Sequence, residues 1–256
     1  MNATRPLQAL ALLTLAANLS ANAADTRNAH DPLEKVNRAM FKFNDKVDKA
    51  VLKPVAKAYK AVLPQPVRTG VANFFANLEY PVVIANDLLQ GKVGQGVHDT
   101  ERLIFNSTFG IGGLFDIATL MRLPRHDEDF GQTLGVWGVG PGWYLVLPLL
   151  GPSTVRDAVA LPADAYIDPL YRISDLTARY SLIGVNVVDM RSRIPPAAEQ
   201  IQAEALDPYL FTRDAYLQRR QRQIEDGQAL PPPPLEEEEE GGPPEGGKPV
   251  PRPGQK

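Results

Sequence analysis

The sequence predicts a mainly α fold of short amphipathic helices with one hairpin-like, glycine-rich insertion. Apolar residues recur at helical spacing in several segments, and these segments begin near a proline or stop near a glycine. The only convincing extended pair surrounds a cluster of glycines between residues 129 and 151. No apolar run reaches the roughly 18 residues of a membrane-spanning helix, so we expect no such helix.

The first predicted helix starts at residue 31. Asp31 is expected to cap it, Pro32 suits its first position, and Glu34 would complete a capping box. Three strips follow at helical spacing: an apolar strip of Leu33, Val36, Met40, Phe43, Val47 and Val51, a basic strip of Lys35, Arg38, Lys42, Lys46, Lys49 and Lys53, and a polar strip of Asn37, Phe41, Asn44 and Asp48. The apolar and basic faces suit a helix lying in a membrane interface, and they also suit a helix packed on a core with a solvated lysine face.

Five further helices are predicted along the chain. Pro66 opens one whose apolar residues reach Leu78, and Pro81 opens a short one that stops before Gly91. The others span Val97 to Phe109, Ser174 to Arg191, and Pro208 to Ile224 with Asp207 as its cap.

The glycine-rich insertion is built to present apolar surface. Gly138, Gly140 and Gly142 are expected to form a turn between two extended arms, because glycine adopts backbone conformations that other residues resist. Both tryptophans of the chain, Trp137 and Trp143, lie in it. Such a segment favours contact with lipid or with a protein partner over catalysis.

The two ends differ from the body in composition. Residues 1–23 are typical of a secretory signal peptide, with an apolar run from Leu7 to Ala17 and a small-residue cleavage pattern at Ala21-Asn22-Ala23. Residues 228–256 hold nine of the 24 prolines and a run of glutamates, so we expect a disordered tail. One helical domain, residues 24–227, remains between them.

The sequence contains no cysteine. We therefore expect neither disulfides nor an acylated N-terminal cysteine, so the protein's own surface would have to hold it at a membrane.

No catalytic or metal site and no cofactor are predicted. His98 and Glu101 lie one helical turn apart and residues 126–129 are acidic, but neither set has the ligand number or spacing of a zinc or calcium site. Ser107 and Ser153 lie in no Gly-x-Ser-x-Gly motif, and Ser153 is expected to cap a following helix. No P-loop and no basic block occur, so we expect neither nucleotide-driven transport nor nucleic-acid binding.

Many short sequence blocks, in one order from about residue 31 to 226, resemble the MlaA/VacJ family of phospholipid-transport proteins. They are Asp31-Pro32-Leu33-Glu34, Asn37-Arg38, Phe43-Asn44, Pro64-Gln65-Pro66, Asn73-Phe74, Phe105-Asn106-Ser107-Thr108, Phe130-Gly131-Gln132-Thr133-Leu134-Gly135, Arg156-Asp157, Asp207-Pro208-Tyr209 and Arg213-Asp214-Ala215-Tyr216. The chain departs from the family in one respect, because members are typically lipoproteins and this sequence has no cysteine.

The resemblance implies a ring of helices in the inner leaflet of the outer membrane, reached after export. A central passive channel would take mislocalised phospholipid from the outer leaflet and pass it to a periplasmic carrier of the MlaC type, beside an outer-membrane porin. We place the lipid path at Asn37, Phe43, Asn44, Asp48, Gly138, Gly140, Gly142 and Trp143. The membrane-interface residues would be Lys42, Lys46, Lys49, Phe74 and Phe75.

Two other function classes stay open. A porin-binding scaffold would use the aromatic segment around Trp137 and Trp143 and would need no polar path. A lipid-acting hydrolase would need Ser107 or Ser153 as its nucleophile, and lipid turnover that depends on either serine would identify it.

The exported protein should begin at Ala24 and carry no acyl chain, because the cleavage pattern ends at Ala23 and no cysteine exists to modify. Intact-mass measurement tests this, and a mass that starts at Met1 or includes acyl chains would contradict it.

Overall fold

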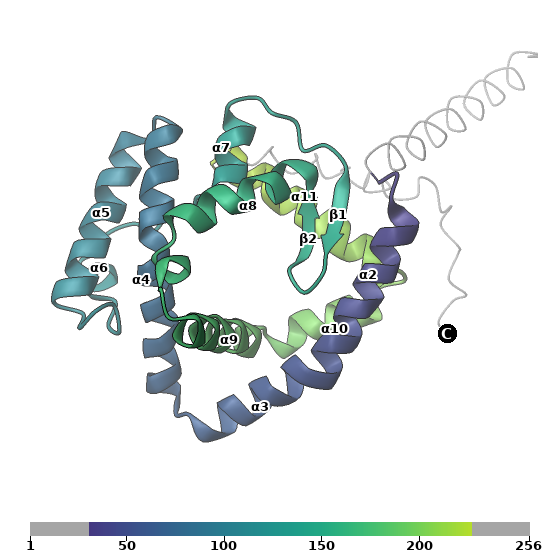
Figure 1. The fold of residues 1–256 in the computed structure, drawn as a ribbon, viewed down its shortest axis with the longest axis horizontal. Coiled ribbons are helices and arrows are strands. Elements are labelled where there is room, and N and C mark those ends of the chain that lie inside the picture. Colours follow the sequence, from purple (N-terminus) through teal and green to yellow (C-terminus); the bar gives the residue numbers. More distant parts are fainter. Residues whose placement is uncertain (1–30, 227–256) are drawn as a thin grey trace, which may run out of the picture.

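The computed structural model describes residues 31–226, so the predicted signal peptide at 1–23 and the predicted tail at 228–256 lie outside the described residues. The described chain forms a ring of helices with one small hairpin (Figure 1). In order, the elements are α2 (Glu34–Val47), the π-helix η1 (Asp48–Leu52), α3 (Lys53–Val62), α4 (Gln65–Leu89), α5 (Val93–Thr108), α6 (Ile117–Leu120), α7 (Phe130–Val136), β1 (Tyr144–Leu147), β2 (Gly151–Thr154), α8 (Val155–Ile167), the 3-10 helix η2 (Pro169–Arg172), α9 (Leu176–Arg193), α10 (Pro196–Glu204) and α11 (Pro208–Ile224). The predicted mainly α fold with one hairpin is confirmed.

The ring is one continuous path of packed elements. One edge of the ring is formed by α2, η1 and α3, and the next edge is formed by α4. The side opposite α3 is formed by α8, α11 and the hairpin (Figure 1). α9 packs against both α3 and α4, while α5 packs on α4 and α6 packs on α5, outside the ring. The N-terminal end of α2 meets the start of α11, where Arg38 donates two hydrogen bonds to Asp207 at 3.1 and 2.7 Å.

The two helices predicted on either side of Pro81 are a single helix, α4. Proline within a helix removes one backbone hydrogen bond and costs roughly 3 kcal/mol. Tertiary packing offsets that cost, because Tyr80, Val82 and Val83 next to Pro81 are all buried. The predicted break was therefore wrong, and packing outweighed the local signal.

The hairpin lies further along the chain than predicted. β1 pairs antiparallel with β2, with Tyr144 opposite Thr154 and Leu147 opposite Gly151. Gly138 and Gly142 have positive φ, as expected for glycines in a turn, but they lie in the connection from α7 to β1 and Gly140 is not among the positive-φ residues. The first predicted arm is instead the helix α7, because Asp129 caps it by accepting a hydrogen bond from the Gln132 amide at 2.9 Å.

Of the three predicted caps, two were wrong and one was right. The buried Asp31 carboxylate accepts a hydrogen bond from the Asn37 side chain at 2.8 Å instead of capping α2. Ser153 lies in β2, and Thr154 caps α8. Asp207 caps α11, whose bounds match the prediction. Asp175, for which no cap was predicted, caps α9.

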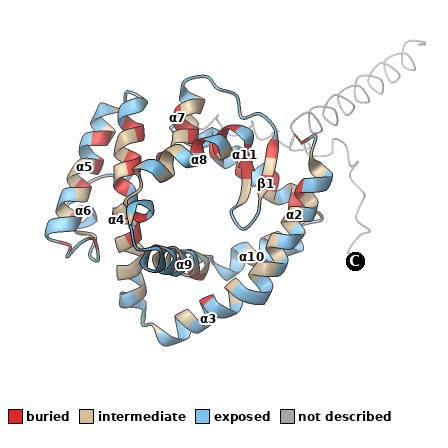
Figure 2. Cartoon of the chain, in the orientation of Figure 1, coloured by how far each residue is buried: buried red, intermediate tan, exposed pale blue. Residues whose placement is uncertain are grey.

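The interior is unusually polar. Among residues 31–226, 12 hydrophobic side chains are buried, compared with 19 polar or charged ones. The apolar cluster is small and lies under the hairpin, where Tyr144, Val146, Tyr209 and Tyr216 pack together. Figure 2 shows most of the outer ribbon exposed, with buried residues concentrated at the contacts between elements. Buried charges therefore have to be paired, because an unpaired charge away from water is costly.

Arg220 makes the most connected of these pairs. Its guanidinium donates to Asp129 at 2.6 and 2.8 Å and to Asp157 at 3.2 and 3.0 Å. It thereby joins α11 to the start of α7 and to α8. Tyr216 also donates to Asp157 at 2.7 Å, and Arg156 donates two hydrogen bonds to it at 3.0 and 2.9 Å. This carboxylate therefore accepts five hydrogen bonds from arginine and tyrosine side chains of α8 and α11. These donors hold the pKa of Asp157 at about 2, in spite of its burial.

Replacing Arg220 with alanine should destabilise the fold strongly, because it leaves two carboxylates without their partner. Breaking a buried ion pair costs about 3–5 kcal/mol, so the thermal midpoint in detergent should fall by several degrees. The matched control is Arg222→Ala, which removes an exposed arginine of the same helix. Equal midpoints for the two variants would show that Arg220 does not hold the ring together.

Candidate functional site

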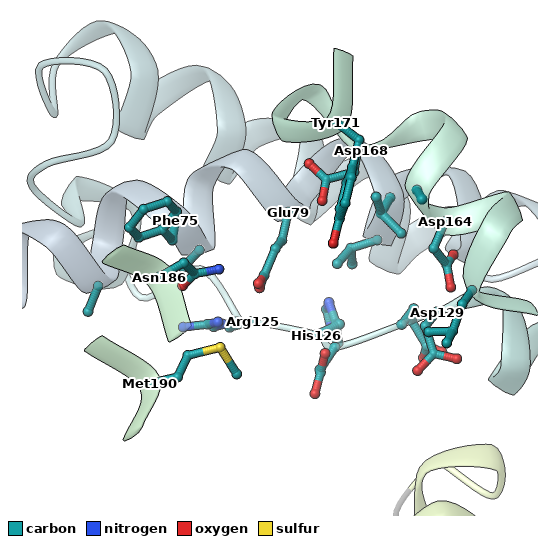
Figure 3. Close-up of a pocket in the computed structure, with 18 of the residues that line it drawn as sticks. Phe75, Glu79, Arg125, His126, Asp129, Asp164, Asp168, Tyr171, Asn186 and Met190 are labelled. Atoms are coloured by element: carbon teal, nitrogen blue, oxygen red, sulfur yellow. The ribbon is translucent and has the colours of Figure 1, made fainter. Parts of the chain in front are cut away.

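A cavity of about 760 Å³ lies between α4, α8, η2 and α9. These elements border the centre of the ring in Figure 1, and the tip of the hairpin contributes Leu150. Its apolar wall includes Phe75, Val82, Val83, Leu161 and Met190, and its polar wall includes Glu79, Arg125, Asp164, Asp168, Asn186 and Arg193 (Figure 3). The cavity therefore offers both apolar and charged surface to one occupant.

Three carboxylates face this cavity with raised pKa values. Burial raises the pKa of Asp164 to about 6, even though the Phe130 amide and the Asn86 side chain donate to it at 3.0 and 3.1 Å. Burial also raises the pKa of Asp168, which accepts one hydrogen bond from the Leu170 amide at 2.8 Å. Glu79 is accessible from the cavity, yet the surrounding protein and the negative charge of Asp127 raise its pKa.

The cations of the cavity come from two other segments. Arg125 lies in the connection before α7, and Arg193 ends α9, where its Nε lies 3.0 Å from Asp189. Both arginines lie close enough to Glu79 to lower its pKa, against the larger effect of burial. Within residues 31–226, neither Glu79 nor Arg125 forms a hydrogen bond or an ion pair with another side chain.

The side chains of the acidic run from His126 to Asp129 pair with residues of other elements. His126 contacts Asp99 at 2.6 Å, Glu128 pairs with Lys92 at 2.8 Å, and Asp129 pairs with Arg220. Among the described residues, no group of three or more candidate ligands is placed to hold a metal ion. The run instead fixes the connection that carries Arg125 along the cavity.

Asn37 and Asn44, predicted in the lipid path, hold the hairpin. The Asn37 amide donates to the Tyr144 carbonyl at 2.9 Å and accepts from the Val146 amide at 3.0 Å. Asn44 repeats the arrangement further along, donating to Leu147 and accepting from Leu149, both at 2.9 Å. The predicted polar strip is therefore the face of α2 that binds the hairpin.

The other predicted path residues are separated in space. Asp48 pairs with Arg191 of α9 at 2.5 and 2.8 Å, whereas Phe43 is about half-exposed on α2. Trp143 is also about half-exposed and immediately precedes β1. None of these residues lines the 760 Å³ cavity.

The predicted interface residues also divide into two groups. Lys42, Lys46 and Lys49 are exposed on α2 and η1, and Lys49 pairs with Asp45 at 2.7 Å. Phe74 is half-buried, while Phe75 is only 3% exposed and lines the cavity, so the structure places Phe75 away from the outer surface.

The two serines considered as nucleophiles have structural partners. Ser107 accepts a hydrogen bond from Asn77 at 2.9 Å, and the Ser153 hydroxyl donates to the Thr154 carbonyl at 3.3 Å. In the part of the chain that the structure describes, neither hydroxyl has a hydrogen bond to a histidine. That part also contains no helix long and apolar enough to cross a membrane.

Sequence reasoning missed the charged residues of the cavity. Glu79 had a usable signal, because it is the single charge within the apolar stretch from Phe74 to Ile84. Arg125 and Asp168 had none, since they lie in short connections 43 residues apart and only the fold brings them to the same cavity.

Comparison with known proteins agrees with this architecture. A family model described as MlaA lipoprotein matches residues 29–223. The chain is 35% identical over 229 residues to the intermembrane phospholipid transport system lipoprotein MlaA of Haemophilus influenzae, covering 88% of this chain and 90% of that protein. It is also 35% identical over 232 residues to the protein of the same description from Escherichia coli K12, covering 88% and 91%. A solved structure from work on the "structural basis for maintenance of bacterial outer membrane lipid asymmetry" aligns with a TM-score of 0.69 at 35% identity, covering 76% of this chain and 98% of that one.

One buried carboxyl beside the cavity should make stability depend on pH. Asp87 of α4 is fully buried, and neither of its oxygens accepts a hydrogen bond from a described donor. Burial and the nearby charges of Asp99 and Glu128 raise the pKa of Asp87 to about 7. The folded state therefore binds a proton that the unfolded chain releases, so this contribution is present below the ordinary value of 3.8 and is lost as the pH rises through 7.

Asp87→Asn mimics the protonated form and should remove this dependence. Relative to wild type, its thermal midpoint should rise between pH 5 and pH 8, whereas the exposed control Glu204→Gln should show no such trend. A difference that is constant across this pH range would contradict the assignment.

Proposed function

The chain belongs to the MlaA family, and from this premise we propose that it transports phospholipid through the centre of its helical ring. Mislocalised phospholipid of the outer leaflet of the outer membrane enters the ring and leaves on the periplasmic side, which maintains lipid asymmetry. Transport is passive, and any energy comes from partner proteins.

The cavity on the inner side of the ring is the observation that carries this proposal. A phospholipid has a charged headgroup and apolar chains, and moving an unmatched polar group through hydrocarbon costs several kcal/mol. A wall with Glu79, Arg125 and Asp168 beside Phe75, Val83 and Met190 offers partners to both parts of the lipid. Lipid can then pass without exposing its headgroup to hydrocarbon.

The outer surface supports residence at a membrane. Large apolar side chains are exposed in numbers that a protein surrounded by water rarely shows, including Phe109, Ile111, Phe115, Leu120 and Met121 around α5 and α6. The exposed lysines 42, 46 and 49 add positive charge that would meet anionic headgroups. We therefore place the ring within one leaflet, on the periplasmic side of the outer membrane.

The hairpin supplies one wall of the path. Leu149 and Leu150 at its tip are 66% and 71% exposed, and Leu150 lines the cavity. Asn37 and Asn44 act on the path by holding this hairpin, and Gly138 and Gly142 allow the connection before it to turn. Asp48 braces the same edge of the ring through Arg191.

The partners follow from the same proposal. An outer-membrane porin would contact the exposed apolar surface, and a periplasmic carrier of the MlaC type would receive the lipid. No catalytic step is included, because neither Ser107 nor Ser153 has the neighbours that activate a serine nucleophile.

Filling the cavity should block transport and leave the fold intact. Ala76→Trp places a large side chain in the cavity wall, while Ala58→Trp adds the same side chain at an exposed position of α3 outside it. In a host lacking the native gene, Ala76→Trp should leave phospholipid in the outer leaflet and raise detergent sensitivity, and Ala58→Trp should restore asymmetry.

Protein level, helical content and membrane fractionation of both variants must match wild type for this comparison. A folded, correctly located Ala76→Trp protein that restores asymmetry would exclude the cavity from the path. It would favour a porin-binding scaffold instead.

A further inference from the structure

The cavity carries charges of both signs that no partner within residues 31–226 fully neutralises. Of its acidic residues, Asp129 is paired with Arg220 and Glu128 with Lys92. Among the described residues, the Glu79 carboxylate has no side-chain partner, and the Asp168 carboxylate accepts its only hydrogen bond from the Leu170 amide. Arg125 is the cation without a partner of its own on the same wall.

These three groups lie around one space. Figure 3 shows the Glu79 side chain between Arg125 and Asp168, each from a different element. The pKa of Glu79 agrees with this closeness, because it is shifted by the charges of Arg125, Asp127, Asp168 and Arg193. The wall thus presents two carboxylates next to a guanidinium, and apolar side chains such as Val82 and Met190 border them.

We propose that the cavity selects zwitterionic phospholipids with a primary ammonium headgroup, whose ammonium lies between Glu79 and Asp168 and whose phosphate lies beside Arg125. This inference rests on the proposed function, because it specifies which lipid the path prefers. A primary ammonium donates hydrogen bonds to carboxylates, and a guanidinium binds phosphate through a fork of N–H donors.

An anionic headgroup without an amine suits this wall less well. Its phosphate could still contact Arg125, but Glu79 and Asp168 would stay unpaired beside a second negative charge. The acyl chains account for the apolar lining, which a soluble amine would leave in contact with water. The pair of carboxylates, Glu79 and Asp168, therefore selects the headgroup, and the acyl chains keep the lipid bound.

The experiment measures which lipid the full-length protein retains. Purified wild type is incubated with vesicles of equal phosphatidylethanolamine and phosphatidylglycerol, re-isolated, and its bound lipid is quantified by mass spectrometry. The wild type should be enriched in phosphatidylethanolamine by roughly two- to fivefold over the supply, the range that one partly exposed ion pair provides. The Glu79→Gln, Asp168→Asn double variant should lose most of this enrichment.

Matched controls separate the effect of the Glu79 and Asp168 pair from the effect of removing any carboxylate. Glu204→Gln removes one exposed carboxylate outside the cavity and should keep the wild-type ratio. The enrichment should also fall as the pH is lowered, because the surrounding protein raises the pKa values of Glu79 and Asp168 and so favours protonation of both carboxylates. Soluble glycerophosphoethanolamine should displace little bound lipid, and efficient displacement would show that the site takes a soluble amine.

The outcomes distinguish the inference from the function on which it rests. Headgroup selection is overturned if the wild type retains the two lipids in the ratio supplied by the vesicles. It is also overturned if the double variant keeps the wild-type thermal midpoint and the wild-type lipid ratio. Either result leaves the proposed transport standing. No retained lipid, together with a functional Ala76→Trp protein, overturns the proposed function as well.

Discussion

The closed ring depends on a few charged pairs at its joints, and the contact of Arg220 with Asp129 and Asp157 is the most extensive of them. A ring with a cavity on its inner side has no single apolar centre, so apolar burial alone cannot hold its elements together. Each joint is instead a directional contact between segments far apart in sequence. Arg220 ties α11 to α7 and α8, and Arg38 ties α2 to Asp207 at the start of α11. The close fit extends to the backbone, because a Cβ at Gly131 would lie 2.6 Å from both Arg220 and Asp157.

This way of closing the ring explains the distribution of polar and apolar side chains. The buried arginines 102, 156, 213 and 220 all contact carboxylates, which offsets the cost of taking their charge out of water. Apolar side chains that a compact domain would bury remain on the outside, and a lipid environment satisfies them at no such cost. The same pattern that makes the surface suitable for a leaflet makes the centre suitable for a headgroup. The proposed membrane residence and the proposed polar path would therefore both follow from one distribution of side chains.

Local signals predicted the elements whose ends depend on neighbouring residues. Asp207 before Pro208 specified the start of α11, since a cap and an N-terminal proline act within one turn. The prediction failed where tertiary packing outweighed local preference, as at Pro81, and where a side chain found a distant partner, as the Asp31 carboxylate did with the Tyr209 hydroxyl. Of the site, the strip containing Asn37 and Asn44 was identified as polar, but its partner was not. Arg125 and Asp168 lie in connections that only the closed ring brings to the same cavity, and no spacing in the sequence encodes that.

The spacing of Asn37 and Asn44 does explain how the hairpin keeps its position. Seven residues advance an α-helix by about 10.5 Å, and three residues advance a strand by about 10 Å. The bonds of Asn37 to Tyr144 and Val146 therefore recur at Asn44 with residues three further along, Leu147 and Leu149. Such a match fixes the hairpin to α2 through four hydrogen bonds, each worth roughly 1 kcal/mol. Because Leu150 at the tip lines the cavity, the helix that carries exposed lysines also positions, through the hairpin, one part of the cavity wall.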